Sequence, residues 1–587
     1  MKRILIVTLL FLFGFVSFSY SKEPSLNQKL ERIDSLAQQA RETFHLPGLA
    51  VGIVMDGELV YAKGYGYRDI DKKLPVTEET VFMIGSMTKA FTTFALATLV
   101  EQGKISWNDK VISYLPDFRL KDSYSTQEMT IRDLVTHVSG LPRHDLVWFF
   151  GKNTTDELYQ KLQYLEPITS FREGFSYQNL MYMVAGKVIE KVTGQDWESY
   201  VKEKILIPLG MGSTTFSIEG LNGSKDFAAP YILEEATSRR IPYHDIRHVG
   251  PAGTINSNLL DLAAWTKMLL NFGQFEEKQL LGSSHIKHLM SPQVVASLTV
   301  QGFPLSNDEF LEAYGFGWMI QSFYGRYLVS HGGAIDGFNS NLALLSLDKI
   351  GVCVLSNQLG PNALGLLTKS ILATLLDEDV EKWLPKSVDV DLVNQEEFPA
   401  KKGTSPSHDL KHYVGVYEHP AYGKLEVFYD NGLQLNFHEF TAALNHLHYD
   451  IFQGEIKTPF APFKLSLSFE TDWYGNVRQV VLPIQFEGIE VPFVKKPQSN
   501  LSTPEYLEIY AGEYTLQNTT IKIFVEGKTL KAEVSGQPLY ELVPKDISSF
   551  SLKGHDNIHF EFVMKNGTEV EILNIVQPQG VFKATPK

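Results

Sequence analysis

The feature that most constrains this chain is an apolar helix whose first turn carries a lysine. Residues 85–89 read Gly-Ser-Met-Thr-Lys, and from Ala90 to Val100 there is no charge and nothing more polar than threonine. Such a run predicts a helix that is buried on nearly every face and stops at Gly103. A cation in the first turn opposes the helix dipole, so Lys89 is placed against local stability.

The position of this lysine predicts catalysis. Ser86 and Lys89 are three residues apart, so one helical turn brings the amine over the hydroxyl. Burial disfavours the ammonium form, which gives a nucleophile with a base beside it. The alternative is an ordinary N-cap serine, although a capping box has Glu or Gln where Lys89 stands. The same Ser-x-x-Lys spacing also occurs at Ser19, Ser199, Ser284 and Ser346.

The N-terminus predicts export. Lys2 and Arg3 precede an apolar run over 4–16 and small residues at 19–21, which is the pattern of a secretory signal peptide over 1–21. The apolar run is short for a membrane span, so we expect a periplasmic or secreted protein without a stable span after signal removal; an uncleaved anchor is the alternative.

Composition narrows the class of protein. At 587 residues, with 44% hydrophobic and 21% charged residues, the chain is globular and longer than one ordinary domain. Removing Lys2 and Arg3 takes the formal charge from −15 to −17, and no basic cluster is long enough to grip phosphates, so no nucleic acid partner is expected. The single cysteine, Cys353, lies in an apolar strand and forms no disulfide framework.

A second motif stands at the head of an apolar helix expected over 180–193. Tyr177 and Asn179 form Tyr-x-Asn there. A phenol next to a cation can be drawn towards phenoxide and act as a general base, and an amide can hold a substrate carbonyl. The alternative is simple helix capping, and the tripeptide also occurs at Tyr429 and Tyr474.

A third motif lies between two expected strands, 327–330 and 341–345. They are joined through His331-Gly332-Gly333-Ala334, where glycines allow a backbone edge to approach a ligand. His248 also fits His-x-Gly but lacks flanking strands. His137, at the end of a short helix, is interpreted as structural.

The pattern changes after residue 378. Residues 379–408 are rich in charge, proline and serine, which predicts a linker. Two β modules are expected over 409–499 and 500–587, because Tyr-Val-Gly-Val-Tyr at 413–417 is answered by Tyr-Ala-Gly-Glu-Tyr at 510–514, an offset of 97. We expect the modules to fold separately from the preceding domain.

Ser-x-x-Lys at Ser86, Tyr-x-Asn at Tyr177 and His-x-Gly at His331 resemble, in this order, the serine β-lactamase and penicillin-binding-protein superfamily, closest to its class C and D-aminopeptidase-like branch. The resemblance covers about residues 26–378 and implies a catalytic domain over 22–378. The implied fold is α+β: an antiparallel sheet flanked by helices plus a helical subdomain. The two all-β modules resemble the small barrel-like, lipocalin-like domains found behind such catalytic domains.

The resemblance also implies a role for each matched residue. The catalytic residues would be Ser86, Lys89 and Tyr177, and the substrate-binding residues Asn179, His331, Gly333 and Ala334. Ser86 would be acylated while Lys89 and Tyr177 share the proton transfers. The backbone N–H groups of Ser86 and Ala334 would form the oxyanion hole, where a helix start favours negative charge.

No cofactor or metal is implied. His285 and His288 lie three apart on an expected helix, but no third ligand has suitable spacing. The departure from the family pattern is His331, where many relatives have the lysine of Lys-Thr-Gly. A fixed cation reads a substrate carboxylate, whereas histidine is only partly charged at pH 7.

These features together predict an exported serine hydrolase that acts through an acyl-enzyme on a small-molecule or peptide substrate. Peptides that contain D-amino acids are the leading substrate class, with a β-lactamase or carboxylesterase as the alternatives. A penicillin-binding sensor or an inactive scaffold without turnover is the alternative of another class. The oligomeric state is left open.

Overall fold

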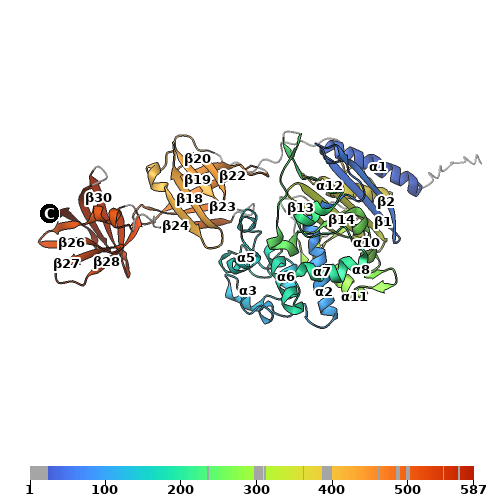
Figure 1. Cartoon of the computed structure of the whole chain (residues 1–587), viewed down its shortest axis with the longest axis horizontal. Helices are drawn as coiled ribbons and strands as arrows, with labels where there is room; N and C mark the ends of the chain where they lie inside the picture. The colour runs from blue at the N-terminus through green and yellow to red at the C-terminus, as the bar shows by residue number, and fades with distance from the viewer. Residues whose placement is uncertain are drawn as a thin grey trace, which may run out of the picture.

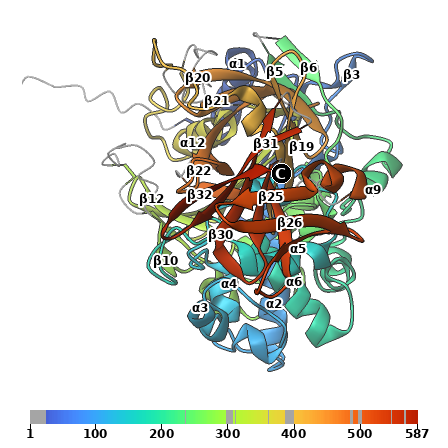
Figure 2. The ribbon, with the colours of Figure 1, turned by 90° about the vertical axis from the view of Figure 1, so that its left-hand side faces the viewer.

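The computed structural model describes residues 24–234, 237–296, 308–309, 312–360, 362–385, 400–460, 462–483, 489–496, 503–546, 548–565 and 569–587. The expected signal peptide, 1–21, lies outside the described residues, as does much of the expected linker. The chain forms three bodies in a row, the N-terminal domain (24–385) and two barrels (Figure 1). Figure 2 looks along this row, with the second barrel nearest the viewer.

A nine-stranded antiparallel sheet organises the N-terminal domain, in the order β10-β11-β12-β13-β14-β15-β1-β2-β3. Its strands are β10 (Val294–Val295), β11 (Glu312–Tyr314), β12 (Met319–Phe323), β13 (Arg326–Ile335), β14 (Phe338–Leu345), β15 (Ile350–Ser356), β1 (Gly48–Met55), β2 (Glu58–Asp69) and β3 (Leu74–Pro75). The fold class expected from the sequence is confirmed.

Helices cover both faces of this sheet. In β1, Val51 and Ile53 belong to the cluster with α1 (Leu26–Thr43) and α12 (Ala363–Leu375). The opposite face packs against α10 (Leu259–Leu270), where a Cβ on Gly52 would lie 3.2 Å from Leu259. Because both faces are covered, β1 reads as a continuous apolar run rather than an alternating one.

The helical subdomain follows β2 along the chain and surrounds α2 (Thr88–Glu101). Its longest helix besides α2 is α6 (Asn179–Thr193), and α5 (Thr155–Lys161) is one of the short ones. The other short ones are α3 (Ser123–Glu128), α4 (Ile131–Val135), α7 (Trp197–Val201), α8 (Ile207–Leu209), α9 (Ile218–Gly223) and α11 (Ser283–Leu289).

Two local signals in the sequence give the structure that they predict: Asp56-Gly57 between two strand-like runs predicts a hairpin, and the uncharged run after Lys89 predicts a buried helix. β1 and β2 form a hairpin whose turn residues, Asp56 and Gly57, both have positive φ, the conformation that a two-residue hairpin needs. All residues of α2 from Thr88 to Leu99 are buried, as the uncharged run predicts.

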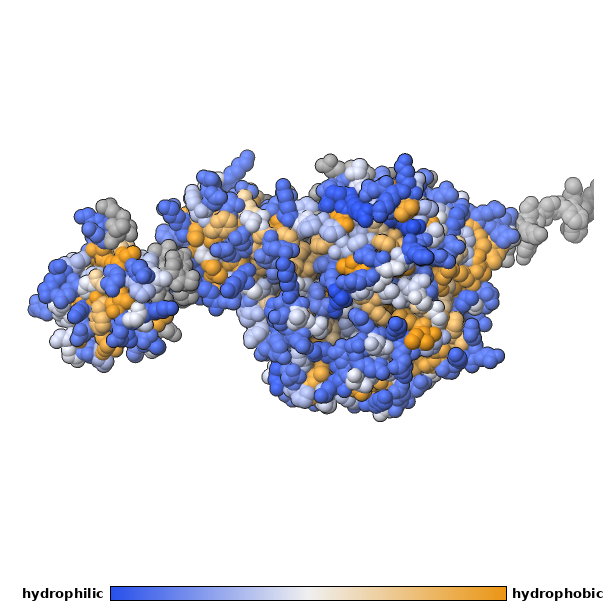
Figure 3. All heavy atoms as spheres, in the orientation of Figure 1, coloured by the Kyte–Doolittle hydropathy of each residue, from blue (hydrophilic) through white to orange (hydrophobic). Residues whose placement is uncertain are grey.

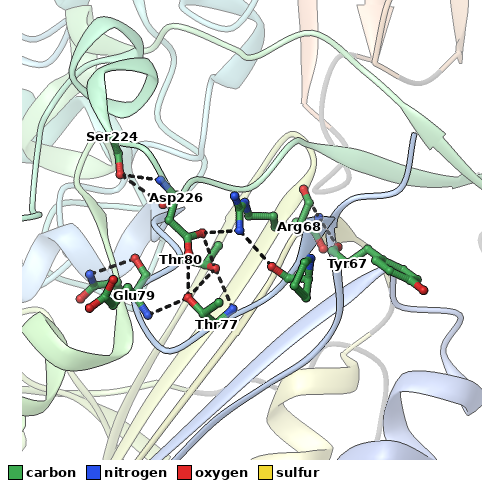
Figure 4. A network of polar contacts seen from close by, with 10 residues as sticks. Tyr67, Arg68, Thr77, Glu79, Thr80, Ser224 and Asp226 are labelled. Atoms are coloured by element: carbon green, nitrogen blue, oxygen red, sulfur yellow. Dashed lines mark hydrogen bonds and ion pairs between the residues drawn. The ribbon is translucent and has the colours of Figure 1, made fainter. Parts of the chain in front are cut away.

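A polar network holds the chain just ahead of α2 (Figure 4). The Asp226 carboxylate accepts hydrogen bonds from Thr77 at 2.7 Å and Thr80 at 2.6 Å. Arg68 lies 3.2 Å from the same carboxylate. This network fixes the approach to β4 (Phe82–Met83), from which the chain turns into Ser86.

The two modules predicted from the repeat are closed eight-stranded barrels. The first barrel contains β17 (Gly415–His419), β18 (Gly423–Tyr429), β19 (Leu433–Phe437), β20 (Phe440–His448), β21 (Ile451–Ile456), β22 (Phe463–Thr471), β23 (Val477–Pro483) and β24 (Glu490–Lys496). The second contains β25 (Gly512–Leu516), β26 (Thr519–Glu526), β27 (Thr529–Val534), β28 (Tyr540–Asp546), β29 (Ser549–Leu552), β30 (His555–Lys565), β31 (Glu569–Gln577) and β32 (Gly580–Pro586), preceded by α13 (Pro504–Leu507).

The repeated motif has the same structural role in both barrels. Tyr417 donates to the Tyr413 carbonyl at 2.7 Å, and Tyr514 donates to the Tyr510 carbonyl at 2.8 Å. Each pair ties the entry into a barrel to its first strand, which explains why the tyrosines recur at a fixed offset.

The end of the N-terminal domain and its contact with the first barrel both differ from the sequence-based expectation. Val380, Trp383 and Leu384 pack into the cluster of α1 and α12, so the N-terminal domain continues into the stretch expected to be linker. The first barrel shares one hydrophobic cluster with the N-terminal domain, so it is not a loosely attached module.

Figure 3 shows hydrophilic residues over most of the visible face of the N-terminal domain. Within the described ranges, no helix combines the length and hydropathy needed to cross a bilayer.

Candidate active site

Lys89 is the centre of the site. Its side chain is fully buried, and Nζ lies 3.1 Å from Ser86 Oγ, 2.8 Å from Asn179 Oδ1 and 2.9 Å from the Ala252 carbonyl oxygen. Burial, followed by the positive charge of Arg143, holds the pKa of Lys89 well below its usual value. In the amine form its two N–H groups suit the two carbonyl oxygens, which leaves the lone pair for the Ser86 proton.

The Ser86 hydroxyl lies where a substrate can reach it from solvent. It lies in the single 3₁₀ turn Gly85–Met87 that precedes α2, and it is partly exposed while Gly85 and Met87 on either side are buried. The chain therefore presents the hydroxyl to solvent and the lysine to the interior.

Tyr177 lies against Lys89 from the start of α6. Lys89 Nζ is 4.8 Å from the centre of its ring, and the His137 ring packs 4.2 Å away on centroids. Burial raises the pKa of Tyr177 to about 12, and a hydrogen bond with Ser86 opposes this shift. The expected drift towards phenoxide is not supported, because desolvation outweighs the Ser86 hydrogen bond and the charge of Arg143. Tyr177 stays a phenol that can relay a proton.

His331 differs from its expectation in two ways. The sequence placed His331 to Ala334 in a connection, but these residues belong to β13, which pairs with β14 through Gly333 and Ser340. The imidazole is buried, with Nε2 3.1 Å from the Tyr314 hydroxyl and Nδ1 2.6 Å from the Gly332 carbonyl oxygen. Burial lowers its pKa to about 3, so the partial charge expected at pH 7 is wrong.

The backbone of β13 passes directly against the turn that carries Ser86. A Cβ on Gly333 would lie 1.9 Å from the Ile84 carbonyl oxygen, so only glycine fits there. Gly85 has φ +52°, and its added Cβ would lie 2.9 Å from the Ala334 nitrogen. The structure thus brings together the two backbones on which the oxyanion hole is predicted; the hole itself stays a prediction.

His137 has a structural position, as expected. It is fully buried, and Nδ1 accepts a hydrogen bond from the Gln178 N–H at 3.0 Å. This contact and the packing of its ring against Tyr177 fix the entry into α6.

Sequence reasoning missed two residues of the site, Arg143 and Asp145. The Arg143 guanidinium lies 5.2 Å from the centre of the Tyr177 ring, and Nε donates to Asp145 at 2.6 Å. Asp145 Oδ1 lies 3.4 Å from Asn179 Nδ2. Charged residues just after Leu141-Pro142 look like an ordinary solvated turn, so only their neighbours in space reveal them.

Potential metal ligands do not gather in the described part of the chain: no group of three or more His, Cys, Asp or Glu side chains could hold an ion. His285 and His288 lie on α11, and His288 packs against Phe316 at 5.1 Å on centroids.

A partly exposed serine with a buried lysine beside it, between an antiparallel sheet and a helical subdomain, fits the serine hydrolase class. The chain belongs to the β-lactamase family: the model described as Beta-lactamase matches residues 33–374. A second match, a domain of unknown function (DUF3471), covers residues 399–495 and so spans all of the first barrel but the last residue of β24.

Two named relatives and one solved structure are similar to this chain. The chain is 30% identical over 428 residues to "Unguisins hydrolase ungD'" of Aspergillus campestris, covering 67% of this chain and 77% of that protein. It is 30% identical over 341 residues to "Protein flp" of Staphylococcus aureus, covering 56% of this chain and 63% of that protein. The structure resembles the octameric penicillin-binding protein homologue from Pyrococcus abyssi, with a TM-score of 0.54, 25% identity, and coverage of 87% and 99%.

Proposed function

We propose that this protein is an exported serine hydrolase that works through an acyl-enzyme on Ser86 and acts on peptides containing D-amino acids. The observation that carries the chemistry is the buried Lys89 amine, 3.1 Å from the Ser86 hydroxyl. A lysine with a lowered pKa in contact with a partly exposed serine is the arrangement of an activated nucleophile.

The reaction has two halves. Lys89 takes the Ser86 proton as Oγ attacks the substrate carbonyl carbon, and Tyr177 relays a proton to the leaving amine or alkoxide as the bond between that carbon and the leaving group breaks. A water then loses a proton to the same pair and attacks the acyl-serine, which releases the acid and restores the hydroxyl. The oxygen that gains negative charge would face the backbone N–H groups of Ser86 and Ala334.

The proposed substrate class rests on His331, the first residue of the third motif. Buried His331 is neutral at physiological pH, so this position supplies no fixed cation for a substrate carboxylate. This favours peptide and ester substrates over the carboxylate-bearing substrates of lysine-containing relatives. The relative named as a hydrolase of unguisins supports hydrolysis as the activity. A β-lactamase or carboxylesterase would use the same chemistry.

Substrate screening with the purified full chain tests the proposal. D-aminoacyl amides, their L-counterparts, short esters and a chromogenic cephalosporin should separate the substrate classes. Ser86→Ala should abolish turnover and leave the fold intact, because the lost hydroxyl changes stability by only a few kcal/mol. Retained activity in Ser86→Ala would remove this serine from the mechanism.

Covalent labelling separates an enzyme from a sensor or scaffold. A fluorophosphonate should add one adduct to the peptide that contains Ser86, and prior substrate should protect the serine only transiently. Stable labelling without turnover on any substrate would favour a sensor. No labelling at all would favour an inactive scaffold.

Export is proposed from residues 1–21, which carry the composition of a signal peptide. Expression with these residues in a bacterial host should yield a shortened mature protein in the periplasmic fraction. N-terminal sequencing of that fraction gives the cleavage point, and full-length protein that stays in the cytoplasm would contradict the proposal.

A further inference from the structure

The first barrel contacts the N-terminal domain at several places, among them Arg239 and His244 at Phe460 and residues 143–150, which we call the docking segment. Phe150 stacks on Phe463 with centroids 5.7 Å apart and an interplanar angle of 9°, and it meets Phe440 edge-on at 5.0 Å. Phe149 meets Phe460 at 6.2 Å. These three contacts join five rings in an apolar joint between the segment and the barrel.

A buried polar contact lies inside this joint. His144 and Tyr422 are both almost fully buried, and His144 Nδ1 lies 2.6 Å from the Tyr422 hydroxyl. His144 Nε2 lies 2.9 Å from the Glu166 carbonyl oxygen. Because a carbonyl only accepts, Nε2 carries the proton and Nδ1 accepts the proton of Tyr422. Burial lowers the pKa of His144 to about 4, which agrees with a neutral ring.

The residues on either side of His144 reach the active site. Arg143 lies over the Tyr177 ring, and Asp145 contacts both Arg143 and the Asn179 amide. Asn179 in turn accepts from Lys89. A continuous chain of contacts therefore runs from a barrel tyrosine to the predicted base, through three consecutive residues of the docking segment.

We propose that the first barrel is a positioning element of the active site, with Tyr422 as its positioning residue. By donating to His144, Tyr422 fixes the backbone of the docking segment so that Arg143 and Asp145 keep Asn179 and Tyr177 in register with Lys89. This proposal rests on the acyl-transfer function proposed above and assigns the barrel a part in it.

The test compares two tyrosines of the same barrel in the full chain. Tyr422→Phe removes the hydroxyl that reaches the docking segment. Tyr417→Phe is the matched control, because it removes an equally buried barrel hydroxyl that donates to the Tyr413 carbonyl at the barrel entry. We expect Tyr422→Phe to slow fluorophosphonate labelling of Ser86 by about tenfold, since a buried acceptor loses its donor, and Tyr417→Phe to label at the wild-type rate.

A pH profile distinguishes positioning from general destabilisation. Lys89 faces the rings of Tyr177 and Tyr182, the charges of Arg143 and Asp145, and the neutral rings of His137 and His331. Of the two charges, Arg143 acts more strongly and favours the amine form. If the docking segment shifts away, the acid limb of the labelling profile should move to higher pH in Tyr422→Phe and stay in place in Tyr417→Phe.

A double substitution measures whether the effects of Tyr422 and Asp145 on the labelling rate are coupled. If Tyr422 acts through Asp145, then Tyr422→Phe should lose little more rate when Asp145→Asn is already present, whereas independent effects would multiply. Equal labelling rates and acid limbs for Tyr422→Phe and wild type would overturn the proposal, as would equal losses in Tyr422→Phe and Tyr417→Phe. Absence of labelling in the wild-type chain would instead overturn the proposed function.

Discussion

The two barrels are copies of one design that meet their neighbours in opposite ways. Both close eight strands behind the same tyrosine contact. The core of the first barrel is continuous with the hydrophobic cluster of the N-terminal domain, while the second barrel has a separate cluster of its own. The second barrel meets the first through a polar edge, where Lys545 lies 3.4 Å from Asp472 and His559 packs against Tyr474.

Two barrels with the same fold therefore need not have the same role. The apolar joint of the first barrel holds residues that touch the candidate active site, so its loss should reach the chemistry. A polar edge contributes little, because exposed ion pairs are screened by water. Four changes to the chain or to the pH test this difference between the two barrel contacts.

Truncation should give the largest effect. A chain ending at Lys496 keeps the first barrel and should stay soluble and label at Ser86. A chain ending at Pro385 would expose Phe149 and Phe150, and it should aggregate or label poorly, since a contiguous apolar patch promotes association. Size-exclusion chromatography and labelling rates measure both outcomes. A soluble, fully active short chain would show that the barrel is an attachment after all.

Acid should weaken the first joint next. Burial lowers the folded-state pKa of His144 from 6.5 to about 4, so below pH 6.5 the unfolded chain binds a proton that the folded chain does not. Stability from this group is present above pH 6.5 and is lost as the pH falls towards 4, by at most about 3 kcal/mol.

Urea unfolding at several pH values measures this loss. His144→Gln should be less stable near neutrality and should show a flatter decline between pH 6.5 and 4. Parallel declines in wild type and His144→Gln would mean that other groups govern the acid response.

Removing one ring from the joint should have a moderate effect. Phe150→Ala should lower the free energy of unfolding by about 2 kcal/mol, because removing this half-buried ring deletes its contacts with two aromatic rings of the barrel. Tyr474→Ala, at the edge between the barrels, is the control and should change stability by less than about 1 kcal/mol. Equal losses would erase the distinction between the two contacts.

The smallest effect is expected at Lys545. Lys545→Ala removes a partly exposed ion pair with Asp472 and should change unfolding by about 0.5 kcal/mol or less, decreasing further in high salt. The labelling rate of Ser86 should not change. A large, salt-insensitive loss would show that the two barrels form one cooperative unit.

Much of the fold could be predicted because its signals are local. The uncharged run after Lys89 gave a buried helix, Asp56-Gly57 gave a hairpin, and the tyrosine repeat gave two barrels. Each signal lies within a window of a few residues or a fixed offset, where period and turn chemistry act directly. The first two motifs also identified Ser86, Lys89 and Asn179, which the structure brings into contact through Lys89.

The protonation states could not be predicted in this way. Whether His331 carries charge, or Tyr177 ionises, depends on how much water the folded chain removes from each ring. Arg143 and Asp145 were missed for a related reason, since their partners in the site, Tyr177 and Asn179, lie at the entry into α6, more than thirty residues further along the chain.

The sequence by itself therefore determined the elements, their repeat and the three residue types that suit acyl transfer, because these depend on neighbours along the chain. Only the tertiary structure decided the surroundings of those residues: the Ala252 carbonyl at Lys89, the strand that holds His331, and the barrel that meets the docking segment. The physical reason is that burial and charge act through space, between segments that the chain separates by more than a hundred residues.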